Sequence, residues 1–186
     1  MDAPYYSCSI YTVPEELNSN YFTANQKLLY DALYHAASAT LNELSKDAKY
    51  LGADIGYICI LHTWGSAMNY HPHIHTIVLG GGLDDENKWK ETGGNFFLPY
   101  GVISKVFRGK YLDELKSLWN DSKLKFHGTA EKYQHHAPRR QHPTPQYSGI
   151  SLIAIVKTSY QRGGKYFVWG AFAGVLDILS HRKSAL

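Results

Sequence analysis

The sequence predicts an α+β fold in which an antiparallel sheet is covered on one face by two helices. Several short runs are rich in β-branched, aromatic or aliphatic residues, as strands are, and two longer segments repeat apolar residues at helical spacing. With 186 residues, of which 44% are hydrophobic, the chain is long enough for one domain with a buried core.

The first strand is expected from Tyr5 to Val13, where Pro14 breaks the run. Thr23 and Gln26 have the spacing of a capping box, and apolar residues then recur at helical spacing. This pattern predicts a helix over Ala24–Leu44.

Two neighbouring strands are expected next. Ile55–Leu61 and His73–Leu79 are apolar runs of strand length, and three glycines end the second. The acidic stretch Asp84–Glu86 then indicates a surface hairpin, and Phe96–Leu98 resumes strand character.

A second amphipathic helix is expected over Ser104–Leu124. After Tyr133 histidines and prolines crowd the chain, which bars helix and indicates a linker. We therefore predict a core over residues 1–133 and a basic, Pro/His-rich linker with a degenerate segment over 134–186. Within the latter, Ile150–Val156 could form a strand, and Gly170–Leu179 has helical spacing.

Composition excludes some classes of protein. No apolar run approaches the roughly 18 residues that cross a bilayer, and the N-terminus does not resemble a secretory signal, so we expect a cytoplasmic protein. Cys8 and Cys59 are expected as reduced thiols. Residues 1–131 hold 11 basic and 15 acidic residues, whereas residues 132–186 hold 8 and 1. This basic tail could contact phosphates or simply be solvated.

The most informative segment is His71-Pro72-His73-Ile74-His75. Side chains alternate along a strand, so His73 and His75 share one face while Ile74 points into the core. Neutral imidazole is the commonest metal ligand, and two on one face can bind one ion. The alternative is a solvent-exposed strand end without a ligand. The buried strand that follows favours a metal site, because unpaired imidazoles beside a core are costly.

Two further histidines could complete this site. His71 has the same parity, but Pro72 suggests that the strand only begins there. His62 ends the preceding strand and could reach the same point if the two strands pair. It could equally be an ordinary strand-end residue.

Several blocks of the sequence resemble the two-tyrosine HUH transposases of the insertion-sequence ninety-one family. The resemblance covers Pro4–Tyr133 and rests on the order and spacing of Val13–Leu17, Leu51–Gly56, Leu61–Gly65, His71–His75, Gly80–Leu83, Phe96–Pro99 and Phe107–Lys110. It implies the HUH endonuclease palm, with His73 and His75 binding a divalent cation, Mn²⁺ or Mg²⁺. It also implies metal-assisted transesterification of single-stranded DNA, in which a tyrosine forms a 5′-phosphotyrosine and frees a 3′-OH.

The chain departs from that family in two respects. It has no Cys-x-x-Cys zinc module before the first strand, and no tyrosine pair four apart after His75. Tyr160 and Tyr166 are the candidate nucleophiles, although six residues separate them. Tyr30 and Tyr34 have the right spacing, but they lie in the first helix, where a structural role is expected. We therefore expect a truncated transposase that lacks its tyrosine nucleophile.

Candidate DNA contacts are Arg108 and Lys110 in the second helix and Arg139 and Arg140 in the tail. Arg108 could instead be an ordinary surface residue of the helix. Three other functions remain open: an HUH replication initiator or relaxase, a catalytically inactive DNA-binding remnant, and an unrelated zinc hydrolase. The hydrolase is disfavoured because no carboxylate stands at ligand spacing beside the histidine pair.

Overall fold

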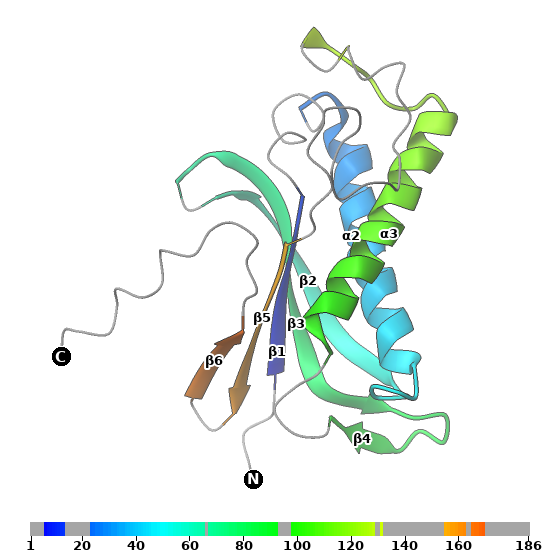
Figure 1. Cartoon of the computed structure of the whole chain (residues 1–186), viewed down its shortest axis with the longest axis vertical. Helices are drawn as coiled ribbons and strands as arrows, with labels where there is room; N and C mark the ends of the chain where they lie inside the picture. Colours follow the sequence, from blue (N-terminus) through cyan, green and yellow to red (C-terminus); the bar gives the residue numbers. More distant parts are fainter. Residues whose placement is uncertain are drawn as a thin grey trace, which may run out of the picture.

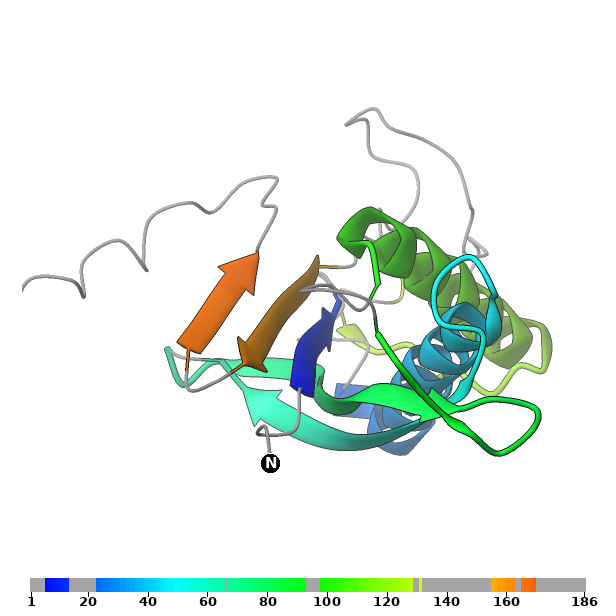
Figure 2. The ribbon, with the colours of Figure 1, turned by 90° about the horizontal axis from the view of Figure 1, so that it is seen from below.

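A computed structural model describes residues 6–13, 23–65, 67–92, 98–128, 131, 155–162 and 165–169. The expected α+β fold is confirmed: an antiparallel sheet packs against two long helices (Figure 1). The helices lie side by side on one face of the sheet (Figure 2). Neither helix in the described part of the chain combines the length and apolar character needed to cross a bilayer.

The sheet has the strand order β2-β3-β1-β5-β6, with β4 paired to β3 outside this path. Its strands are β1 (Tyr6–Thr12), β2 (Asp54–Trp64), β3 (Tyr70–Leu83), β4 (Trp89–Glu91), β5 (Ile155–Arg162) and β6 (Lys165–Trp169). Every strand pair is antiparallel. The expected β2–β3 pairing is therefore confirmed, as is the surface hairpin, which joins β3 to β4.

The strands β5 and β6 lie in the segment that the sequence sets apart after residue 133. β5 pairs along the whole of β1, so residues 155–162 are part of the sheet. The expected strand Ile150–Val156 overlaps β5 only at its end, and residues 150–154 are outside the described part. The division of the chain at residue 133 stays a prediction.

The first helix, α2 (Thr23–Lys46), matches the predicted range closely. Asn25 has a non-helical backbone there, with φ −132° and ψ 28°. Its Nδ2 donates to the Lys125 carbonyl at 2.8 Å, and the Lys125 N–H donates to its Oδ1 at 2.8 Å. Asn25 therefore ties the start of α2 to the segment that follows the second helix.

The second helix, α3 (Tyr100–Asn120), begins and ends four residues earlier than predicted. Pro99 is its N-cap residue. Proline suits a helix start, because an N–H at that place has no acceptor within the helix and its loss costs no hydrogen bond. Leu124 is buried but lies beyond the helix end, so apolar spacing alone overextended the prediction. Of the expected strand Phe96–Leu98, only Leu98 is described, and it lies in a bend, buried just before α3.

The core lies between the sheet and the helices. It contains inward-facing residues of β1 and β3, such as Tyr11, Ile74 and Val78, and the facing sides of both helices. Cys59 in β2 carries a free thiol, as expected. The opposite face of β2 and β3 is open, and it exposes Ile58, Ile60, Ile77 and Leu79. An open face beside a packed one is common in antiparallel sheets.

Candidate metal centre

His73 and His75 lie on the open face of the sheet, opposite the helices. Ile74 between them is fully buried in the core, and successive side chains of a strand point to opposite faces. The apolar run that follows therefore anchors β3 on the helix side and presents the two imidazoles on the other. This arrangement agrees with the alternation expected from the sequence.

His62 joins them from the neighbouring strand. It is the direct cross-strand partner of His73 in the β2–β3 register, and partners in an antiparallel pair share a face. The ring centroids of His62 and His75 are 4.1 Å apart, those of His73 and His75 4.9 Å, and those of His62 and His73 5.3 Å. One nitrogen of each of the three rings lies within 4.8 Å of the other two. We call His62, His73 and His75 the histidine triad.

The protonation of His73 and of His75 suits these two residues to metal binding. The Nδ1–H of His73 donates to the backbone carbonyl of His71 at 2.6 Å. A carbonyl can only accept, so this bond assigns the proton to Nδ1 and leaves Nε2 as the nitrogen with the lone pair. Burial, together with His62 and then His73, lowers the pKa of the His75 imidazole to about 4. His75 is therefore neutral near pH 7, as a ligand must be.

The triad fits a divalent metal ion. Three imidazoles converging from two strands resemble the donor sets of open sites, in which protein ligands leave positions for a substrate oxygen. No carboxylate joins this group among the residues that the structure describes. Three histidines could thus form a metal site at this place in the sheet.

His71 lies beside this group, with its ring centroid 5.4 Å from that of His73, but its ring nitrogens are not among those that converge. Its Nε2 shares a hydrogen bond of 2.8 Å with the hydroxyl of Thr12 in β1. Thr12 is also the direct β1 partner of His73, so this contact links the start of β3 to β1. The geometry therefore favours His62 over His71 as the third ligand.

The two candidate tyrosines lie away from the triad in the backbone register. Tyr160 pairs with Ser7, which pairs with Val78, so Tyr160 is in register with a core position three residues from His75. Tyr166 in β6 pairs with Gln161, four residues beyond the partner of Ile10, and two strands separate β6 from β3. Strand geometry then puts the Tyr166 backbone roughly 20 Å from that of His75.

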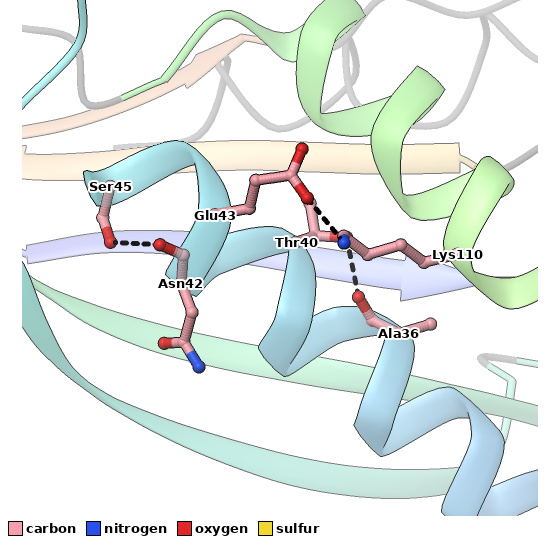
Figure 3. Close-up of polar contacts among 6 residues, drawn as sticks. All are labelled: Ala36, Thr40, Asn42, Glu43, Ser45 and Lys110. Atoms are coloured by element: carbon pink, nitrogen blue, oxygen red, sulfur yellow. Dashed lines mark hydrogen bonds and ion pairs between the residues drawn. The ribbon is translucent and has the colours of Figure 1, made fainter. Parts of the chain in front are cut away.

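The candidate DNA contacts in α3 lie on the helix side of the sheet. The ammonium of Lys110 donates to Oε2 of Glu43 in α2 at 2.6 Å, which ties the two helices together (Figure 3). Arg108 is exposed on α3. The sheet therefore lies between α3 and the triad, and the expected contact of both residues with DNA stays a prediction. Arg139 and Arg140 lie outside the described residues, as do Gly170–Leu179.

Tyr30 and Tyr34 have the structural role that was expected. The Leu61 N–H at the edge strand β2 donates to the Tyr34 hydroxyl at 3.0 Å. The hydroxyls of Tyr30 and Tyr70 share a hydrogen bond of 2.6 Å. Both tyrosines of α2 therefore attach this helix to the β2–β3 pair.

Two neighbours of the triad were not identified from sequence. Thr12 meets His71 only because β1 pairs with β3, a contact between residues 59 apart that no local pattern reveals. Trp64 stands two residues after His62, and its side chain is 58% exposed. Its place two residues after His62 was the usable signal, because side chains two positions apart along a strand share one face.

The fold and the triad define a class: an α+β domain whose open sheet face carries a candidate metal centre. Residues 56–161, more than half of the chain, match the family described as "Putative transposase" (Y2_Tnp), and the chain belongs to this family. The expected family is thereby confirmed, and the match continues to residue 161, beyond the expected limit at Tyr133.

Two curated relatives are similar to this chain. "Putative transposase y4qJ" of Sinorhizobium fredii (strain NBRC 101917 / NGR234) is 37% identical over 118 residues, which cover 63% of this chain and 29% of that protein. "Transposase for insertion sequence element IS801" of Pseudomonas savastanoi pv. phaseolicola is 37% identical over 81 residues, covering 44% and 18%. The chain thus spans less than a third of the length of the curated relatives it matches.

Among solved structures, a phage SAM lyase in complex with S-methyl-5′-thioadenosine covers 90% of each chain at 13% identity. Its TM-score is 0.24, which is too low to support an inference about fold or function.

Proposed function

We propose that this chain is the metal-binding core of a rolling-circle transposase acting on single-stranded DNA. The observation that carries the proposal is the histidine triad on the open face of a sheet, in a chain of the transposase family. DNA recombination by metal-assisted transesterification, with a 5′-phosphotyrosine intermediate, is the corresponding reaction. The cytoplasm remains the expected location.

All three residues of the triad act as metal ligands in this proposal. His73 and His75 supply lone pairs from one rigid strand, and His62 supplies a third from its partner strand. The bond from His73 to the His71 carbonyl orients the ring, as outer hydrogen bonds do for metal-ligating histidines. A bound Mn²⁺ or Mg²⁺ would supply Lewis-acid stabilisation of charge on phosphate oxygens. An all-imidazole set favours Mn²⁺ over Mg²⁺.

A second candidate is a metal-dependent DNA-binding protein without nicking activity. The register of Tyr160 and Tyr166 favours it, because neither backbone is close to the triad. Metal binding and nucleophilic attack are separate tasks, and a positioned hydroxyl contributes roughly 10⁵ M or more of effective concentration in favourable cases. We propose that the chain binds metal and DNA but lacks a working nucleophile.

The proposal is tested by binding of a labelled single-stranded oligonucleotide and its duplex, with Mn²⁺ or with EDTA. We expect Mn²⁺ to tighten single-strand binding in the wild type and to have no effect on a His73→Ala/His75→Ala variant. Affinity should fall with salt, as phosphate contacts release counterions. An Arg139→Ala/Arg140→Ala variant tests whether the tail contributes to that salt dependence. Binding that does not depend on Mn²⁺, or that prefers duplex, would count against the proposed function.

A further inference from the structure

Trp64 is a large aromatic side chain left in solvent at the end of β2. Its side chain is 58% exposed, although the indole is among the side chains that gain most from burial. It follows His62 by two residues, and extended strand geometry separates their Cα atoms by about 7 Å. Trp64 therefore lies two positions along β2 from His62 of the triad.

The exposed residues of β2 alternate regularly and include Ile58, Ile60, His62 and Trp64. The β2–β3 register shifts between His62 and Trp64, because Trp64 pairs with Tyr70 while His62 pairs with His73. The extra residue of this irregularity lies in β3, so β2 keeps its alternation. Trp64 thus continues the exposed positions of β2 that include His62, and its ring lies against that of Tyr70.

The surroundings of Trp64 hold its backbone and ring in place. The Tyr70 ring meets the indole edge-on, with centroids 6.3 Å apart and an interplanar angle of 84°. Tyr70 is itself hydrogen-bonded to Tyr30 of α2. The chain then turns at Gly65, whose N–H donates to the Asn69 carbonyl at 2.8 Å.

We infer that Trp64 is a base-stacking platform, which receives the base of a nucleotide flanking the phosphate at the triad. This inference rests on the proposed function, because it needs single-stranded DNA at the triad. An exposed aromatic ring beside a phosphate-binding group is the arrangement by which proteins hold single strands. Stacking on a side chain requires an unstacked base, so Trp64 also makes the site selective for single strands over duplex.

An aromatic side chain held edge-on by a second ring suits this task. Its position is set before DNA binds, so little conformational entropy is lost on stacking. The ring is a positioning residue: it orients a nucleotide and does not touch the reacting atoms. Because every base has a π-face, the platform is expected to tolerate any sequence at that nucleotide.

The test compares Trp64→Ala and Trp64→Phe with Trp89→Ala in the full chain. Trp89 is a matched control, since it is 54% exposed but pairs with Leu83, ten residues along β3 from His73. The probes are a fluorescent oligothymidylate, the same strand with single abasic positions, and a duplex, all with Mn²⁺. Mn²⁺ affinity, thermal melting and molar mass in solution are measured for each variant.

We expect Trp64→Ala to weaken single-strand binding roughly tenfold or more, and Trp64→Phe to retain most of the affinity. Trp89→Ala should bind as the wild type does. Mn²⁺ affinity and duplex binding should not change. One abasic position should weaken wild-type binding and have little further effect in Trp64→Ala, because the same contact is already lost.

Three results would overturn the inference. If the wild type binds single strands with Mn²⁺ but Trp64→Ala binds equally well, the platform is wrong while the proposed function stands. If Trp64→Ala changes the molar mass and not DNA affinity, Trp64 belongs to a contact between copies of the chain. If the wild type shows no Mn²⁺-dependent binding, the proposed function fails and the inference with it.

Discussion

At the scale of single residues, differences in side-chain contacts decide which histidines can serve as ligands of the proposed metal ion. His62 is paired with His73 across the strands and stacks on His75, whereas the His71 ring is engaged by Thr12. We therefore expect His62→Ala to lower Mn²⁺ affinity at least tenfold, and His71→Ala to change it by less than about threefold. Electron paramagnetic resonance of free Mn²⁺ measures both. The opposite ranking would make His71 the third ligand.

Two buried phenols in the core offer a prediction about stability. The hydroxyls of Tyr11 and Tyr111 are buried with no hydrogen-bond partner among the described residues, and burial raises the pKa of both. An unsatisfied buried hydroxyl is costly, so Tyr111→Phe should raise the free energy of unfolding by about 1 kcal/mol or leave it unchanged.

The matched control is Tyr70→Phe, which removes a hydroxyl that is bonded to Tyr30 at 2.6 Å. It should lower the free energy of unfolding by about 1 kcal/mol. Urea denaturation compares the two variants. A clear loss of stability in Tyr111→Phe would mean that its hydroxyl has a partner outside the described residues.

At the scale of elements, the backbones of β2 and β3 lie very close together at the run of glycines near the end of β3. A Cβ at Gly82 would collide with the backbone carbonyl of Asp54 in β2. Gly82→Ala should therefore lower the free energy of unfolding by about 2 kcal/mol or more, since backbone atoms cannot move aside cheaply.

Gly109 of α3 is the control for this substitution. A Cβ there meets nothing within 4 Å, and alanine favours helix over glycine by about 1 kcal/mol. Gly109→Ala should thus stabilise the protein. Thermal melting of both variants checks the pair, and equal effects at the two positions would contradict the close β2–β3 approach.

The elements also show how far the sequence predicts the structure. Periodicity located both helices and the strand that carries His73 and His75, because each buries one face locally. It placed α3 four residues too late, since Leu124 is buried outside the helix and Pro99 marks the true start. The pairing of β1 with β3 and β5, and with it the Thr12–His71 contact, could not be predicted, because register between distant strands leaves no local pattern.

The residues of the candidate site were likewise predictable where they depend on one strand, and not where they depend on the register between strands. The shared face of His73 and His75 is a property of one strand and was predictable. The contribution of His62 depended on the register between β2 and β3, so the sequence left it open. The register of Tyr160 and Tyr166 depended on β5 and β6 joining the sheet, which the composition of that segment did not indicate.

At the scale of the whole molecule, the sheet separates two surfaces. The helices, which carry Arg108 and the Lys110–Glu43 pair, cover one face (Figure 2). The triad lies on the opposite face of β2 and β3. Substrate is therefore expected on the open face. The aliphatic side chains exposed there, Ile58, Ile60, Ile77 and Leu79, suit bases better than a duplex backbone.

The register of β5 and β6 predicts that the protein does not nick single-stranded DNA. When the protein is incubated with labelled single-stranded DNA and Mn²⁺, no covalent adduct that survives denaturation should form, because neither the Tyr160 backbone nor the Tyr166 backbone is in register with the triad. Mn²⁺-dependent binding of the same oligonucleotide shows that substrate is engaged. An adduct that disappears in Tyr160→Phe or Tyr166→Phe would identify that tyrosine as a working nucleophile.

The most direct measurement is a calorimetric titration of the metal-free protein with Mn²⁺, because the whole account depends on the triad as a metal centre. For the wild type we expect saturable binding of one Mn²⁺ per chain at neutral pH, where His75 is uncharged. For a folded His73→Ala/His75→Ala variant we expect no saturable binding. Equal Mn²⁺ affinity in the two proteins would contradict the assignment of the metal centre.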